Sequence, residues 1–425
     1  MLTLYRLLAI LLGPLLIRRL HRPGADHDGL RERRHERRGQ VQAQSNRPIW
    51  IHAASVGEVN AATGLIEVLQ RRWPEPDAIV VSTFTVTGAL QLGRRFGDRL
   101  THHFLPVDTL TSTRRWLDRV DPSLCIIIET EIWPELFEQL GRRGVGIVIA
   151  NARLGVTGQG RAKRFGRLYR RALAHVDLAL CQTEQDAERF RELGLAEDKI
   201  EVGGNLKFDA ALPPGLIEQA RTLRQQWGQR PSWVAGSTRP GEESIVLAAH
   251  QRLLERYSEG LLVLAPRHPE RAAEVAELIR ARNMRWQRLG EPVQAETQIV
   301  LVDRLGMLGP CYAAAQSTFV GGSLVPLGGH NLLEPAALGK AVMTGPYLDQ
   351  QQAAASALDA AGALVKVDDA ASLAAALEAM WTDPNRALAQ GRAALAVIES
   401  GRGALRRTVE QVLSRHARPS SQRSS

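Results

Sequence analysis

Four ionisable residues stand where apolar, strand-like runs end. Glu58 follows the run PIWIHAAS and a short SVG turn, at the first turn of an expected helix. Glu129 and Glu131 close the run LCIII, and Lys207 follows a short strand in GNLKFD. A carboxylate beside a ligand cleft can act as a general base. Buried carboxylates need partners, so Glu129 or Glu131 is expected to pair with Lys207.

The same residues also fit structural roles. Ser55 and Glu58 are three residues apart, which is the spacing of a capping box at a helix N-terminus. A pair between Glu129 or Glu131 and Lys207 could be a salt bridge with no part in catalysis. The residue pattern alone leaves both interpretations open.

A glycine-punctuated stretch, GGSLVPLGGHNLLEPAALGKAVMTGP, covers residues 321–346. It follows a short apolar strand and contains a helix-like run, 332–338. Glycine lets the backbone approach a ligand closely, and a helix N-terminus offers unpaired N–H groups to an anion. The stretch therefore predicts a phosphate or nucleotide cradle. Asn331 and Glu334, at N-cap and N3 spacing, could instead form a capping box that needs no ligand.

Arg267 lies in APRHPER, directly after the apolar strand LLVLA. An arginine at a strand end suits a phosphate, and Pro266 and Pro269 would make the turn rigid. A solvated loop arginine is the alternative.

The sequence contains little that indicates a metal or cofactor site. The only D-x-D pattern, 26–28, lies in the basic N-terminal connector, and neither an H-E-x-x-H motif nor a P-loop nor a G-x-S-x-G elbow occurs. The three cysteines are not spaced for zinc or for a disulfide framework. We therefore expect no metal, no cofactor and a reducing compartment.

The chain of 425 residues is too long for one core. From Pro48 onward, strands alternate with helices, which indicates parallel βαβ units. Uninterrupted apolar strands such as CIII and VGIVIA suit a sheet covered on both faces. The sequence predicts an α/β protein with two doubly wound domains facing a central cleft, over 46–210 and 211–416. Residues 417–425 are expected to form a disordered tail.

Residues 1–45 are expected to form a membrane-anchor helix and a basic connector. The uninterrupted apolar part, 7–17, is shorter than the roughly 20 residues that a spanning helix needs, and Pro14 would kink it. We therefore predict a helix that lies in, or is anchored to, the cytoplasmic leaflet of a membrane. The basic run RERRHERR, 31–38, could meet anionic head groups, or it could be a solvated charged helix.

The charge distribution argues against a nucleic-acid partner. The net charge is +9, but residues 1–50 hold ten arginines against four acids, and residues 401–425 hold six arginines against one glutamate. The body between them carries about −2. A nucleic-acid groove would be expected to carry its positive charge on the folded body.

Six blocks in this order resemble the 3-deoxy-D-manno-octulosonic acid (Kdo) transferase family: HAASVGEV, ETEIWPEL, NARL, GNLKFD, APRHPER and the stretch 321–346. The resemblance runs from the N-terminal helix to about residue 350, and more loosely to about 415. It implies a GT-B glycosyltransferase that transfers Kdo from CMP-Kdo to a lipid A precursor, lipid IVA, in lipopolysaccharide core biosynthesis. It also implies an inverting, metal-independent reaction at the cytoplasmic side of the cell inner membrane.

The resemblance assigns roles to individual residues. Glu58 matches the family's general base, and Glu129 and Lys207 match proposed stabilisers of the transition state. The positions that match CMP-binding segments are Pro266, Arg267, Leu305, Gly306, Met307, Asn331, Leu332, Leu333 and Glu334. Met307 is a departure, because many members of the family have Glu there.

Two other functions remain open. The chain could be another GT-B nucleotide-sugar transferase or an epimerase that uses UDP. It could also be a non-catalytic membrane scaffold with a degenerate nucleotide site.

Overall fold

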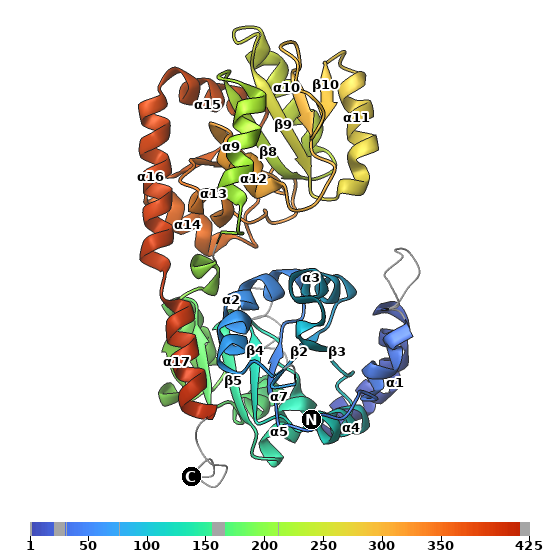
Figure 1. Ribbon diagram of the computed structural model, residues 1–425. Coiled ribbons are helices and arrows are strands. Elements are labelled where there is room, and N and C mark those ends of the chain that lie inside the picture. The colour runs from blue at the N-terminus through green and yellow to red at the C-terminus, as the bar shows by residue number, and fades with distance from the viewer. Residues whose placement is uncertain are drawn as a thin grey trace. The chain divides into compact units, whose positions relative to one another are not determined.

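The computed structural model describes residues 2–20, 30, 32–75, 77–154, 166–210 and 212–416. The chain divides into two compact units. Unit 1 comprises Met1–Ala210 and Gly401–Ser425, and unit 2 comprises Ala211–Ser400 (Figure 1).

The described part of unit 1 is built on a seven-stranded parallel sheet in the order β3-β2-β1-β4-β5-β6-β7. The strands are β1 Ile49–His52, β2 Ile79–Thr83, β3 Thr101–Phe104, β4 Leu124–Ile128, β5 Gly146–Ala152, β6 Leu178–Cys181 and β7 Ile200–Val202. The helices after α1 are α2 Val56–Arg72, α3 Val86–Phe96, α4 Leu110–Val120, α5 Pro134–Arg142, α7 Gly166–Leu173, α8 Glu184–Glu192 and α17 Ala404–His416. Short 3-10 turns are η1 Glu32–Arg38, η2 Gly97–Arg99, η3 Glu197–Lys199 and η4 Leu206–Asp209. This is the doubly wound order that the alternation of elements predicts.

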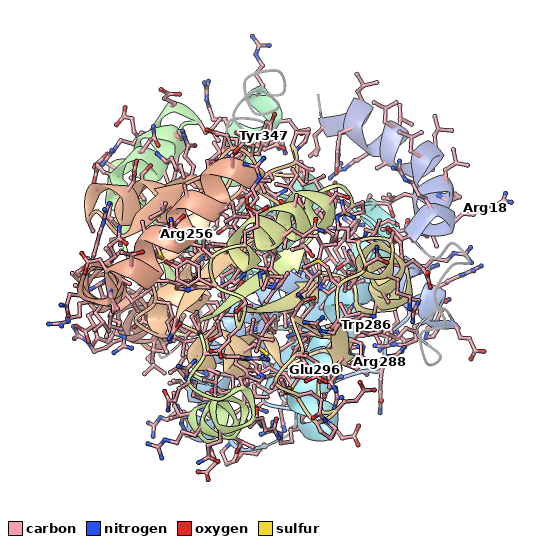
Figure 2. The ribbon with its side chains drawn as sticks, turned by 90° about the horizontal axis from the view of Figure 1, so that it is seen from above. Arg18, Arg256, Trp286, Arg288, Glu296 and Tyr347 are labelled. Atoms are coloured by element: carbon pink, nitrogen blue, oxygen red, sulfur yellow. The ribbon has the colours of Figure 1, made fainter. Side chains whose placement is uncertain are left out.

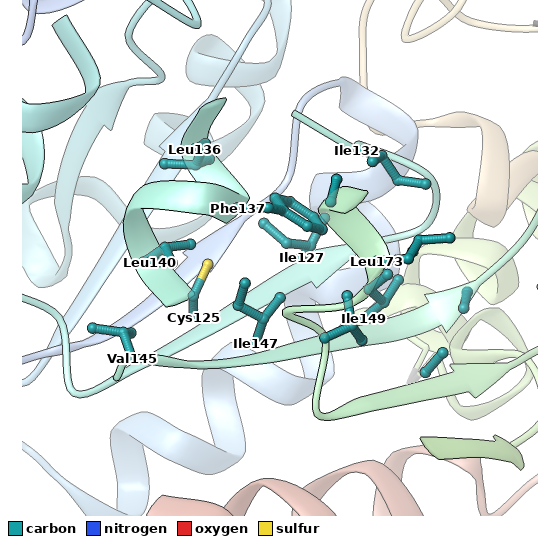
Figure 3. Close-up of a cluster of buried hydrophobic side chains, with 14 of the residues drawn as sticks. Cys125, Ile127, Ile132, Leu136, Phe137, Leu140, Val145, Ile147, Ile149 and Leu173 are labelled. Atoms are coloured by element: carbon teal, nitrogen blue, oxygen red, sulfur yellow. The ribbon is translucent and has the colours of Figure 1, made fainter. Parts of the chain in front are cut away.

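Strand β4 shows why the apolar runs are uninterrupted. Successive side chains of a strand point to opposite faces. Cys125 and Ile127 accordingly join one buried cluster with Phe137 (Figure 3), whereas Ile126 and Ile128 join the cluster on the other face. Helices therefore cover the sheet on both sides, as predicted.

Helix α1, Leu2–Leu20, is held against unit 1 by polar contacts from one of its faces. The hydroxyl of Tyr5 donates to Asp108 Oδ2 at 2.6 Å. The guanidinium of Arg6 donates to both carboxylate oxygens of Glu135, at 2.6 and 3.1 Å. Ile17 is buried. The predicted N-terminal helix therefore forms and is docked on the folded body.

The rest of α1 leaves a row of large apolar side chains in solvent. The exposed ones are Leu4, Leu7, Leu8, Ile10, Leu11, Leu12 and Leu15, with exposed fractions of 48–71%. Near the end of the helix, Arg18 points outward from it (Figure 2). In the part of the chain that the structure describes, no helix is long and apolar enough to cross a membrane.

The basic run at 31–38, for which contact with lipid head groups and a solvated charged helix were both open, is partly structural. The guanidinium of Arg37 is fully buried, 4.3 Å from the ring centroid of Phe104, and donates to the carbonyl of Leu105 at 3.0 Å. The guanidinium of Arg33 donates to Glu36 at 2.7 Å. Arg33 also donates to the carbonyl of His102 in β3 at 2.6 Å, so these two arginines fasten η1 to the edge of the sheet. Residue 31 lies outside the described residues.

The described part of unit 2 also forms a seven-stranded parallel sheet, in the order β10-β11-β9-β8-β12-β13-β14. The strands are β8 Ser232–Thr238, β9 Leu261–Pro266, β10 Trp286–Arg288, β11 Ile299–Leu301, β12 Ser317–Val320, β13 Val342–Thr344 and β14 Leu364–Lys366. The helices are α9 Leu216–Trp227, α10 Glu242–Leu254, α11 Ala272–Arg280, α12 Leu308–Ala314, α13 Leu333–Ala337, α14 Gln352–Ala360, α15 Ala370–Thr382 and α16 Pro384–Gly401. A 3-10 turn, η5 Pro269–Arg271, follows β9.

The last helix, α17, belongs to unit 1, which differs from the predicted second domain over 211–416. Asp209 accepts the N–H groups of Gly403 and Leu405 at 2.7 and 2.8 Å, and Val412 is buried in the core of unit 1. Figure 1 shows α17 beside α2 and β5. The chain thus returns to the first sheet after completing the second. The tail predicted for 417–425 lies outside the described residues.

Candidate active site

Glu58 lies in the first turn of α2, just after β1. Its carboxylate accepts the backbone N–H of Ala54 at 2.7 Å and the hydroxyl of Ser55 at 3.0 Å. The Ser55 side chain accepts no capping hydrogen bond from α2. The capping box is therefore not complete: the Glu58 carboxylate reaches back, but it accepts the backbone N–H of Ala54 and the side-chain hydroxyl of the N-cap residue Ser55 instead of the Ser55 backbone N–H. These contacts orient the carboxylate without neutralising it.

The surroundings of Glu58 favour its protonated form. Burial, followed by the charges of Glu131 and Glu129, raises the pKa of Glu58 to about 8. Desolvation and neighbouring carboxylates both disfavour a charged carboxyl group. A base whose pKa lies near the working pH is suited to taking a proton from a hydroxyl group.

Glu129 and Lys207 form the predicted ion pair. Lys207 Nζ lies 2.8 Å from Glu129 Oε1, and both side chains are partly buried. Glu129 has a φ of +63°, which places it in the left-handed region. That conformation costs a non-glycine residue roughly 1–2 kcal/mol. Because β1 and β4 are neighbours in the sheet, Glu58 and Glu129 follow adjacent strand ends.

Two asparagines hold Lys207 in place. Asn151, with a φ of +55°, accepts the backbone N–H of Leu206 at 2.9 Å. Asn205 accepts the N–H of Lys207 at 3.0 Å. Asn tolerates the left-handed region better than most residues. The NARL and GNLKFD blocks are thus joined by one hydrogen bond, a positioning role that the sequence analysis missed.

In unit 2, the first glycine pair of the stretch 321–346 holds a side chain of the protein itself. The fully buried carboxylate of Glu242 accepts the N–H groups of Gly322, Ser323 and Leu324 at 2.6–2.9 Å. It also accepts the N–H of Arg239 at 2.8 Å. The prediction that these glycines cradle a ligand is therefore wrong for this half of the stretch. A nest of backbone N–H groups binds an anion, and here the anion is Glu242.

The second half of the stretch is open to a ligand. Asn331 Oδ1 accepts the N–H of Leu333 at 3.2 Å at the start of α13. No described residue donates a hydrogen bond to the Glu334 carboxylate, so the capping box that was the alternative for this segment is not formed. Burial raises the pKa of Glu334 to about 7, against the opposing charge of Arg267. A partly buried carboxylate that accepts no hydrogen bond from the described part of the chain is suited to accept ligand hydroxyl groups.

Arg267 follows β9, where its backbone N–H donates to the carbonyl of Thr238 at 3.0 Å. Its guanidinium has no ion pair within the described residues. Arg239, which the sequence analysis missed, follows the neighbouring strand β8 and contacts two imidazoles. Its Nε donates to His330 Nε2 at 3.2 Å, and its Nη1 lies 2.8 Å from His268 Nε2. Burial, followed by Arg239, lowers the pKa of both histidines, that of His330 to about 4.

The remaining predicted CMP-binding positions lie at the same edge of the sheet. Leu305, Gly306 and Met307 connect β11 to α12. Leu305 is 54% exposed, and Gly306 has a φ of +84° that favours glycine. The sheet order places β11 beside β9 and β8 beside β12, so the segments 305–307, 266–267 and 331–334 all follow carboxyl ends of one parallel sheet. Ligands bind at this edge in open α/β sheets.

Comparison with known proteins identifies the family. The family model for 3-deoxy-D-manno-octulosonic-acid transferase (kdotransferase) matches residues 32–210. A 3-deoxy-D-manno-octulosonic acid transferase of Haemophilus influenzae is 38% identical over 369 residues, covering 85% of this chain and 86% of that protein. The Bordetella pertussis transferase of the same name is 34% identical over 379 residues, with the same two coverages.

The fold has solved relatives with little sequence similarity. A UDP-N-acetylglucosamine 2-epimerase aligns with a TM-score of 0.59 at 14% identity, over 89% of this chain and 99% of that one. This likeness and the two parallel sheets support the predicted GT-B architecture of two Rossmann-like domains. The extent of the identity to the two transferases places this chain in the Kdo transferase family, as a glycosyltransferase of lipopolysaccharide biosynthesis.

Proposed function

We propose that this protein transfers Kdo from CMP-Kdo to a hydroxyl group of a lipid A precursor, lipid IVA, with inversion at the anomeric carbon. Family membership supports the sugar and the pathway. The observation that carries the chemistry is Glu58, a partly buried carboxylate with a raised pKa beside the Glu129–Lys207 pair.

In this proposal, Glu58 takes the proton from the attacking acceptor hydroxyl. The acceptor oxygen then forms a bond to the anomeric carbon of Kdo, while the bond from that carbon to the phosphate oxygen breaks and CMP leaves. Lys207, held by Glu129, stabilises the negative charge that develops in the transition state of the transfer. That the reaction needs no metal or cofactor remains a prediction.

Unit 2 supplies the donor-binding groups. Arg267 makes no ion pair within the described residues and binds the phosphate, on which charge develops as CMP leaves. Glu334 accepts the ribose hydroxyl groups. Leu333 N–H is already bonded to Asn331, so we assign it no phosphate contact. Met307 precedes α12, where its backbone can still contact the nucleotide without a glutamate side chain.

The choice of nucleotide tests the donor assignment. We expect CMP to bind at least about tenfold more tightly than UDP in a calorimetric titration of the purified protein. Arg267→Ala should lose most of that affinity. The matched control is Arg256→Ala, an exposed residue (Figure 2) that pairs with Glu378 and should bind CMP like the wild type. Tighter binding of UDP would favour another GT-B transferase or an epimerase, and binding of neither would favour a scaffold.

We further propose that α1 attaches the protein to the cytoplasmic face of the inner membrane. Leu4, Leu8, Leu11 and Leu15 follow one another at helical spacing and are 48–71% exposed. Such a row buries its apolar area in the interfacial region of a bilayer. The acceptor is a lipid, so attachment would keep enzyme and substrate at one surface.

Replacing Leu8, Leu11 and Leu15 together with Asp should release the protein from vesicles of bacterial phospholipid. Each substitution exchanges a favourable apolar contact for a charge that resists burial. Sedimentation with vesicles measures the bound fraction, which we expect to fall by at least about tenfold. The control is Leu388→Asp, at an exposed leucine of α16. Unchanged sedimentation of the triple variant would exclude this face as the anchor.

A further inference from the structure

Arg239 is a cation in unit 2 that the proposed transfer has not yet used. It follows β8 directly, two residues after Ser237, whose φ of +57° is in the left-handed region. Its backbone N–H is fixed by Glu242 at 2.8 Å, and Arg267 follows the adjacent strand β9. The β8–β9 pairing therefore brings two guanidinium groups to one sheet edge. Burial, followed by the charge of the neighbouring Arg267, lowers the pKa of Arg239.

The protein contacts of the Arg239 side chain do not neutralise it. Its side-chain partners are the imidazoles of His268 and His330, which accept its hydrogen bonds as neutral rings. The nearby carboxylate of Glu242 is already saturated by four backbone N–H groups. Glu270 Oε1 lies 3.3 Å from Nδ1 of His268, so this carboxylate contacts the imidazole. Two partly buried guanidinium groups without a bound carboxylate call for anionic ligands.

The donor carries two anionic groups close together, as the two neighbouring arginines require. Kdo is a sugar acid, and in its nucleotide-activated form the anomeric carbon bears both the carboxylate and the phosphate oxygen. An arginine that binds one group therefore leaves the other within reach of a second arginine. Guanidinium groups bind carboxylates and phosphates with paired hydrogen bonds.

We propose that Arg239 is the carboxylate-binding residue for the donor sugar, while Arg267 binds the phosphate. This inference rests on the proposed function. His268 and His330 position the guanidinium by accepting two of its N–H groups, which leaves others for the carboxylate. Held at both groups, the donor presents its anomeric carbon in a fixed orientation. The subsite would also select sugar acids over neutral sugars, because a neutral sugar leaves Arg239 without a partner.

The test distinguishes binding of the donor's sugar from binding of its nucleotide. In a transfer assay with CMP-Kdo and a lipid A precursor, Arg239→Ala should raise the KM for CMP-Kdo by about 10- to 100-fold, as expected for loss of a charged hydrogen bond. The inhibition constant of CMP, which lacks the carboxylate, should change by less than about threefold. Arg239→Lys keeps the charge and should recover part of the donor affinity. Arg256→Ala, at a largely exposed arginine that pairs with Glu378, is the matched arginine control.

Three results would overturn the inference. The first is an equal loss of CMP and CMP-Kdo affinity, which would make Arg239 a phosphate ligand. The second is wild-type KM for CMP-Kdo in Arg239→Ala. The third is a KM for Arg239→Lys no better than that of Arg239→Ala when thermal unfolding shows both variants folded. If the alanine variant does not fold, Arg239→Lys is compared with the wild type instead. The KM for CMP-Kdo should then rise in the lysine variant, while the inhibition constant of CMP should not. Failure of the wild-type protein to transfer Kdo would instead overturn the proposed function.

Discussion

Glu58→Gln should lower the kcat of Kdo transfer by about 10²- to 10⁴-fold, which is the range for loss of a general base. Glutamine can keep the hydrogen bonds to Ala54 and Ser55 that orient the side chain, but it cannot take a proton. The affinity for CMP should stay close to that of wild type, because the residues proposed to bind the donor lie in unit 2. A continuous transfer assay and a CMP titration on the same preparation measure both quantities.

The pH profile makes this prediction more specific. Because burial and two neighbouring carboxylates raise the pKa of Glu58 to about 8, the base form is scarce at pH 6 and dominates above pH 8. The wild-type kcat/KM for the acceptor should therefore rise with pH and level off above about 8. The kcat/KM of Glu58→Gln should show no such rise with pH. That of Glu67→Gln, at a partly exposed position of the same helix, should still rise as in the wild type. Wild-type turnover in Glu58→Gln would remove Glu58 from the role of base.

Lys207→Ala should lower kcat by about 10²-fold, the effect of removing one preorganised electrostatic donor. It should also move the rising limb of the pH profile to higher pH. Without its partner, Glu129 exerts more of its charge on Glu58, and Glu129 already raises the pKa of that residue. Lys199→Ala, in η3 of the same unit, is the control.

A purely structural ion pair would give a different result. The pair is partly exposed, so its contribution to stability is expected to be only about 1 kcal/mol or less. If Lys207→Ala lowers the midpoint of thermal unfolding slightly and leaves kcat and the pH limb unchanged, the pair serves the fold alone. The structural interpretation of the sequence would then be the correct one.

Local patterns were enough to predict the parallel sheets. Strand β4 buries all five of its residues, which is why an uninterrupted apolar run indicates a sheet covered on both faces. Glu58, Glu129 and Lys207 each follow the carboxyl end of a strand, so all three lie at the same edge of the sheet of unit 1. Position relative to a strand is a local property, so it can be recognised without knowing the rest of the fold.

Contacts between distant segments could not be predicted. Glu242 stands 80 residues before Gly322, and nothing in either segment indicates that one fills the nest of the other. Arg37 looks like part of a solvated basic run, but it packs between aromatic rings of other elements. The charged helix α17 carries no local sign of which sheet it covers. Its contacts with unit 1 are made by the distant Asp209, through two hydrogen bonds, and by the burial of Val412. Arg239 was missed because its histidine partners lie 29 and 91 residues away.

The central claim is Kdo transfer from CMP-Kdo to a lipid A precursor, and mass spectrometry of the product tests it most directly. Purified wild-type protein is incubated with CMP-Kdo and lipid IVA, and the Haemophilus influenzae relative serves as the positive control. We predict that the acceptor gains the mass of one or more Kdo residues and that CMP is released in equal number. An unchanged acceptor mass, under conditions in which the control converts the same acceptor, would contradict the claim.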